Sequence, residues 1–189
     1  KGMTSSQVSG LNTTQIQTLT TSQVQGLTAA QLNGLSSTQV QALESADLAA
    51  IKGNTLGALG TAQIQSLSST QVQNLNETQL KGLRADQLNA MDAADVTAMS
   101  TTQISQLKPD QLSKLSTGQL NALGTAQVQA LTGAQVRSLT SSQVASLSDT
   151  QLQAMTTVQA SVLTDKQLNA LSTSQMASLE SAGVAALSA

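Results

Sequence analysis

The chain has 189 residues, and its 8 basic and 10 acidic side chains are scattered singly and give a net charge of −2. It contains no Phe, Tyr, Trp, Cys or His, which excludes disulfides, thiolate chemistry, Cys-based metal sites and the commonest general base and metal ligand. We therefore expect no enzyme activity, no catalytic, cofactor-binding or metal-binding residues, and no cofactor.

Charge and hydropathy patterns also limit the partners. Because no basic stripe follows the chain, we expect no nucleic acid partner. No apolar run approaches the roughly 18 to 20 residues that cross a bilayer, so we expect no membrane span, and no export signal can be read at the start. Without aromatic residues, a core must be built from Leu, Val, Ile, Met and Ala and is expected to be thin.

Octapeptide repeats run without insertion or deletion from residue 4 to residue 187, which gives 23 copies. Position eight of each octad is always a large aliphatic residue, and it is Leu in 19 copies. Position five is Val, Ile, Leu or Met in all but one copy, position four is Gln in 19, and position one is Ser, Thr, Asn or Asp in 16. We predict one tandem array over residues 1–189, which has no distinct capping repeat and is a slice of a longer array.

A short helix is expected at positions two to seven of each octad, beginning with residues 5–10, 13–18 and 21–26. Ser or Thr followed three residues later by Gln is the capping box of a helix N-terminus, and the flanking apolar residues form a hydrophobic staple. Leu27, Thr28, Gln31 and Leu32 show all four parts. Further along the chain, Pro109 falls at the first helical position, where proline is favoured.

One continuous helix is excluded, because a period of eight would need about 4.0 residues per turn in place of 3.6. We therefore predict a bend at position eight of each octad. Gly10, Gly26, Gly34 and Gly82 at position seven are expected to ease it through the left-handed conformation. The predicted fold is all-α, a narrow superhelical α-solenoid with one helix per octad. A β-solenoid is the alternative, because Thr, Ser, Val and Gln also suit stacked strands.

Two acidic pairs have a spacing of three residues. Glu44 with Asp47, and Asp92 with Asp95, suggest a cation site or a paired carboxylate, or else acids that occupy the N-cap and the first helical turn and complement the helix dipole. We favour the second interpretation. The same dipole favours the acids at positions two and three, which are Glu77, Asp86, Asp110, Asp149 and Asp165.

Polar residues suggest two further kinds of site. Rows of Thr at positions one to three suggest an ice-binding or glycosylated face, and Asn12 and Asn76 each begin an Asn-x-Thr triplet. Capping and a solvated polar face are the interpretation we favour. The Gln at position four is interpreted as a cap and not as a ladder that binds a ligand. The most degenerate octads, residues 44–59 and 156–163, are expected to be weak or bent points.

The recurring Leu-Ser/Thr-x-x-Gln-Val/Ile/Leu, as in residues 19–24 and 139–144, resembles octapeptide-repeat tracts of very long bacterial secreted or surface proteins of the adhesin-like or haemagglutinin-like kind. The resemblance covers essentially the whole chain and implies an extracellular or cell-surface location. The expected function is a structural component of a filament, stalk or sheath that self-associates. The alternative is an adhesin-type binding module that uses a regular Thr/Ser-rich face for a surface or glycan ligand.

Overall fold

The structure is a computed structural model that describes residues 2–183 and, for side chains, residues 2–179. Short helices joined by turns fill this range, which contains no strand. The predicted all-α solenoid is confirmed, and the β-solenoid alternative is wrong. The chain divides into two compact units, residues 1–99 and 100–189.

Helices follow the octad register in both units. In the first unit they are α1 (Ser5–Ser9), α2 (Thr13–Gln17), α3 (Thr21–Gln25), α4 (Ala29–Asn33), α5 (Ser37–Ala42), α6 (Ser45–Ala50), α7 (Gly53–Gly57), α8 (Thr61–Gln65), α9 (Ser69–Gln73), α10 (Glu77–Gly82), α11 (Ala85–Ala90) and α12 (Ala93–Ala98). In the second unit they are α13 (Thr101–Gln106), α14 (Pro109–Leu112), α15 (Thr117–Ala122), α16 (Thr125–Gln129), α17 (Gly133–Ser138), α18 (Ser141–Ala145), α19 (Asp149–Gln153), α20 (Thr157–Ser161), α21 (Asp165–Leu168) and α22 (Thr173–Gly183).

Capping boxes begin most of these helices, as predicted. In α5, the Ser36 hydroxyl accepts from the Gln39 amide at 3.3 Å, and the Gln39 side-chain oxygen accepts from the Ser36 amide at 2.8 Å. Pro109 is the first residue of α14, which confirms its expected position. Side-chain cap bonds are missing where position one is Glu44, Lys52, Gly60, Arg84, Asp92, Lys108 or Gly124.

Removal of one cap should have a modest effect. Ser68→Ala deletes the hydroxyl that accepts from the Gln71 amide at 3.2 Å, and it is expected to lower the free energy of unfolding by about 1 kcal/mol. Urea denaturation followed by far-UV circular dichroism measures the change. Thr70→Ala is the matched control, because Thr70 is exposed two residues further on and no side-chain hydrogen bond is shown for it. Equal losses in both variants would contradict the capping role.

The bend between helices consists of two extended residues. Leu43 at position eight has φ −63° and ψ 131°, and Glu44 after it has φ −66° and ψ 143°. The expected left-handed glycine is wrong: Gly10, Gly26 and Gly34 have φ near −80° in the right-handed helical region, and Gly82 is the last residue of α10. A break between helices needs no positive φ, because turning positions eight and one to the extended region is enough.

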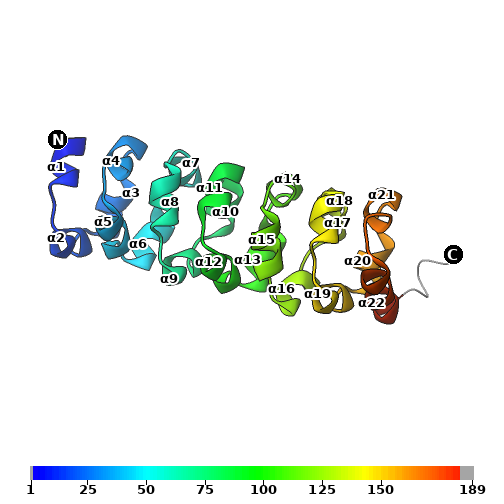
Figure 1. Cartoon of the computed structure of the whole chain (residues 1–189). Helices are drawn as coiled ribbons and strands as arrows, with labels where there is room; N and C mark the ends of the chain where they lie inside the picture. The colour runs from blue at the N-terminus through cyan, green and yellow to red at the C-terminus, as the bar shows by residue number, and fades with distance from the viewer. Residues whose placement is uncertain (1, 184–189) are drawn as a thin grey trace. The chain divides into compact units, whose positions relative to one another are not determined.

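A narrow apolar core follows positions five and eight, as the repeat predicted. Leu80 and Leu83 are 0% and 3% exposed, and most aliphatic residues in the same positions are also buried. Within each unit, most helices pack against the third helix along the chain, as α1 does with α4, α7 with α10 and α14 with α17 (Figure 1). The chain of each unit therefore winds as a superhelix that stacks its turns.

Three glycines allow one unusually close helix contact. A Cβ atom added to Gly53 of α7 would lie 2.6 Å from the Thr78 carbonyl oxygen, and one added to Gly82 of α10 would lie 2.7 Å from the Gly53 carbonyl oxygen. A Cβ atom at Gly57 would also meet the carbonyl oxygen of Gly82. Backbones of α7 and α10 therefore approach to a distance that leaves no room for larger residues.

The end of the described chain departs from the predicted pattern. Helix α22 runs through Leu179, where a bend was expected, and continues to Gly183. Residues 180–187 carry Glu180 and Gly183 in place of the Ser or Thr and the Gln that begin a new helix elsewhere. The rest of this octad, residues 184–187, lies outside the described residues. Among residues 2–183, no helix has the length and apolar character to cross a membrane.

Candidate functional site

Side chains at position four perform two tasks at once, as Gln79 shows. Its oxygen accepts from the Asn76 main-chain amide at 3.0 Å, which is the capping bond that the sequence predicted. Its nitrogen donates to the carbonyl oxygens of Leu48 and Ile51, both at 2.8 Å and 31 and 28 residues earlier. Gln79 is 0% exposed, so one buried amide caps its own helix and binds the preceding turn of the superhelix.

The bonds between turns recur through both units, and we call them the glutamine ladder. In the first unit the acceptors are the carbonyls of Ser9 and Leu11 for Gln39, Asn33 and Leu35 for Gln63, Val40 and Leu43 for Gln71, and Leu56 and Leu59 for Gln87. In the second unit they are those of Ile104 and Leu107 for Gln135, Leu112 and Leu115 for Gln143, Leu120 and Leu123 for Gln151, Val128 and Leu131 for Gln159, Val136 and Leu139 for Gln167, and Ala145 and Leu147 for Gln175.

Short helices explain why the ladder is needed. The last four carbonyls of an α-helix have no partner within it, and a helix of five or six residues consists largely of its two ends. Within its own octad, the carbonyl of position five accepts from the amide of position eight, as Val40 does from Leu43 at 3.2 Å. The amide of Gln71 adds a second bond to Val40 and also binds the carbonyl of Leu43. The glutamine ladder therefore satisfies buried acceptors that would otherwise be costly.

The interpretation of position four as a cap alone is thus incomplete. One signal in the sequence could have revealed the second task. A capping box accepts either Glu or Gln, and the helix dipole favours Glu near the N-terminus, yet position four is never Glu in the 23 octads. Only the amide supplies a donor together with the acceptor, so the exclusion of Glu indicates that the nitrogen is used.

The two acidic pairs do not gather into a metal site. Glu44 and Asp92 are N-cap residues, and Asp47 and Asp95 stand at position four in the first turns of α6 and α12, which confirms their expected positions. Asp47 accepts from the Thr21 hydroxyl at 2.6 Å, and Asp95 accepts from the Ser69 hydroxyl at 2.8 Å. Both are buried, whereas Glu44 and Asp92 are exposed. Within the described residues there is no group of three or more acidic side chains that could hold a metal ion.

Asn12 and Asn76 serve as helix caps. The Asn12 side-chain oxygen accepts from the Gln15 amide at 2.9 Å, and that of Asn76 accepts from the Gln79 amide at 3.0 Å. The Asn76 side-chain nitrogen also donates to the Ala49 carbonyl at 3.0 Å. A glycan on Asn76 would have to fit around this bond between turns, whereas Asn12 makes no such bond.

Arg84 is a further link between turns that the sequence did not suggest. Its guanidinium donates to the carbonyls of Gly57 and Leu59 on the preceding turn. It also pairs with the exposed Asp86 at 3.0 Å, and this hydrogen bond, together with the charge of Arg84, holds the pKa of Asp86 below its ordinary value. An exposed pair of this kind contributes little to stability, so the bonds to the carbonyls are the more important ones.

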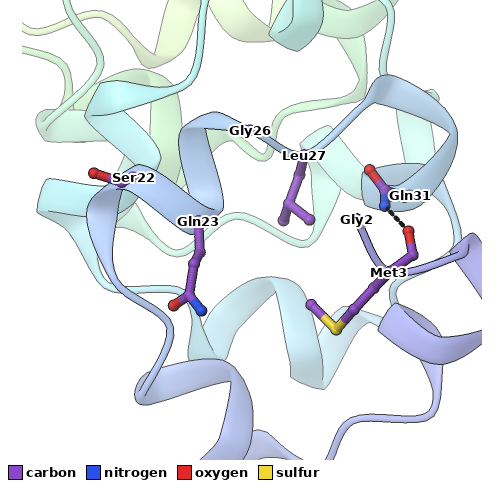
Figure 2. Close-up of a pocket in the computed structure, with 7 residues that line it drawn as sticks. All are labelled: Gly2, Met3, Ser22, Gln23, Gly26, Leu27 and Gln31. Atoms are coloured by element: carbon purple, nitrogen blue, oxygen red, sulfur yellow. Dashed lines mark hydrogen bonds between the residues drawn. The ribbon is translucent and has the colours of Figure 1, made fainter.

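A cavity of about 370 Å³ lies within the first turn (Figure 2). One ladder bond joins two of its lining residues, from the Gln31 side-chain nitrogen to the Met3 carbonyl oxygen at 2.6 Å (Figure 2). Among the described residues that line it, none carries a charge. The lining residues are Gly2, Met3, Ser22, Gln23, Gly26, Leu27 and Gln31.

Together, the octad helices and the ladder define a tandem-repeat α-solenoid. The family model of the ALTTAQ repeat matches residues 40–77 and 108–141, so the chain is similar to this repeat in both units. The six letters of that name correspond to positions seven and eight of one octad and one to four of the next, as in ALGTAQ at 58–63. No curated protein matches the chain. The match supports a repeat protein and does not extend to the adhesin-like or haemagglutinin-like proteins that the sequence resembles.

Proposed function

We propose that the chain is a structural component of an extracellular filament, stalk or sheath. The observation that carries this proposal is the glutamine ladder. Its acceptors are main-chain carbonyls, so within each unit the glutamines bind the preceding turn through the backbone, whatever residues are exposed. A contact that depends so little on the exposed side chains can be renewed many times, which suits a long and uniform structure.

Self-association is the second part of this proposal. Positions two, three and six are largely exposed and are mostly Ser, Thr, Ala, Gln or Asn, with isolated charges. A surface with so little charge offers weak repulsion between neighbouring copies. We propose that neighbouring chains pack side by side in a fibre, sheath or bundle.

Electron microscopy of the native material tests the proposal. A thin, regular filament on the cell surface or in the medium is the expected result, and surface proteolysis of intact cells should remove it. Sedimentation of the 189-residue chain over a range of concentrations tests association separately. A dilute, monodisperse sample that scatters as a stable single particle at every concentration would contradict self-association.

The exposed hydroxyls favour a second candidate, an adhesin-type binding module. Thr13 and Thr14 of α2 and Thr21 and Ser22 of α3 are exposed at the same positions of successive octads. If this regular face binds a surface or glycan ligand, Thr→Lys substitutions at Thr13 and Thr14 should abolish attachment while the circular dichroism spectrum is unchanged. Unchanged attachment would exclude this face as the binding surface.

A further inference from the structure

Position four lacks Gln in three octads of the first unit: the single octad 92–99, which has Asp95, and the two consecutive octads 44–51 and 52–59. The longer interruption of the glutamine ladder is the one at residues 44–59. On one side of the interruption, Gln39 binds the carbonyls of Ser9 and Leu11 at 2.9 and 2.6 Å. On the other side, Gln63 binds those of Asn33 and Leu35 at 3.1 and 3.3 Å. Between them, position four is Asp47 and then Thr55. We call these two octads the ladder gap.

Carbonyls on the preceding turn lose their donors at the gap. By the register of the ladder, Asp47 would face Ile16 and Leu19, and Thr55 would face Val24 and Leu27, which are 31 and 28 residues earlier. Among the described residues, no side chain donates to any of these four carbonyls. The bond from the Thr21 hydroxyl to Asp47 at 2.6 Å remains as a polar link, and apolar packing supplies the rest.

The helices of the ladder gap are also weakly stabilised within themselves. Glu44 and Lys52, their N-cap residues, make no side-chain cap bond. Helix α7 contains Gly53 and Gly57, and glycine in a helix costs about 1 kcal/mol relative to alanine. Helices of five or six residues are unstable alone, so these two depend on their neighbouring turns more than the others do.

Contacts on the far side of the gap are close. Gly53 and Gly57 of α7 lie against Thr78 and Gly82, and the Asn76 side chain donates to the Ala49 carbonyl at 3.0 Å. Helices α6 and α7 are thus held to the following turn by backbone contact and a polar bond. The boundary without ladder bonds lies between them and the preceding turn, where α6 still packs against α3.

From these features we infer that the ladder gap is a built-in opening point, at which the superhelix of the first unit separates before it separates elsewhere. The turn that carries α2 and α3 parts from the turn that carries α6 and α7, while α7 stays against α10. Once parted, α6 and α7 lose packing on one side and unfold locally, which exposes their amides. This inference does not depend on the proposed function.

Hydrogen exchange of the native 189-residue chain at single-amide resolution tests the inference. The amides of Leu48 and Leu56 each bond to the first residue of their octad at 2.9 and 3.0 Å, as that of Val40 does at 2.9 Å. We expect Leu48 and Leu56 to exchange about tenfold faster than Val40, because an octad with a ladder bond must also break that bond to open. Simple fraying from the start of the chain gives the opposite order, because Val40 is nearer that end. Exchange at Leu48 and Leu56 that is as slow as at Val40 would overturn the inference.

Two variants extend the test. Asp47→Gln with Thr55→Gln restores the missing donors, and exchange at Leu48 and Leu56 should slow by about tenfold. Gln71→Asp introduces an interruption at another octad, and the amide of Val72 should then exchange about tenfold faster. If the variant with Asp47→Gln and Thr55→Gln keeps its fast exchange at Leu48 and Leu56, the missing ladder bonds are not the cause and the inference fails. The comparison within the native chain stands even if a variant does not fold.

Discussion

Replacement of Gln79 by leucine is expected to lower the free energy of unfolding by about 3 to 5 kcal/mol. Leucine fills a similar volume but leaves two main-chain groups unpaired, the amide of Asn76 and the carbonyl of Ile51, and it removes the second of two bonds to the carbonyl of Leu48. Each buried polar group that loses its partner costs about 1 to 3 kcal/mol, and the apolar side chain recovers part of the total. Urea denaturation followed by circular dichroism measures the loss.

Gln79→Glu tests the ladder bonds separately from the capping bond, because it keeps the acceptor of the cap and removes the donor of the ladder. Glutamate keeps the oxygen that accepts from Asn76 but presents a second oxygen, in place of the donor, to two carbonyl oxygens. Burial and these acceptors should raise the pKa of the introduced carboxyl, because they disfavour its charged form. The destabilisation is therefore expected at neutral pH and should shrink as the pH falls through that raised pKa and the protonated acid regains a donor.

Gln15→Leu is the control for capping alone, since Gln15 is exposed and caps Asn12 without a ladder bond, and it should cost about 1 kcal/mol. Equal losses for Gln79→Leu and Gln15→Leu would contradict a structural role for the ladder.

Gly82→Ala should destabilise the first unit by about 1 to 3 kcal/mol. Most octads have Ala or another small residue at position seven, and alanine favours helix over glycine, so the repeat pattern alone predicts stabilisation. The structure predicts the opposite sign, because the new methyl group would lie 2.7 Å from the Gly53 carbonyl oxygen. Helices α7 and α10 would have to move apart. Thermal denaturation decides between them, because it shows whether the variant melts below or above the native chain.

Gly118→Ala is the matched control for this substitution. Gly118 lies inside α15, is exposed, and a Cβ atom there would find its nearest neighbour, the Ser116 hydroxyl, 4.0 Å away. Alanine at this position should therefore stabilise by about 0.5 to 1 kcal/mol. Stabilisation by both substitutions would show that α7 and α10 do not approach as closely as the structure has them.

Local features of the fold were predictable because their causes lie within one octad. The cap at Ser36, the proline at the start of α14 and the bend at Leu43 depend on residues at most a few positions apart. The two apolar positions likewise follow from the period of eight. Asp47 was assigned correctly to the first turn of its helix, but its bond to Thr21, 26 residues away, was beyond any local pattern.

The sequence by itself determined that each octad begins its own helix and places two aliphatic residues toward a shared core, because capping and side-chain periodicity act over eight residues or fewer. Only the tertiary structure decided what Gln79 binds on its second side and why Gly82 cannot be larger. Both depend on which octads come to lie together. The superhelix brings together residues that are about 24 to 31 positions apart in the sequence, and this separation is set by how the bends add up over three to four octads.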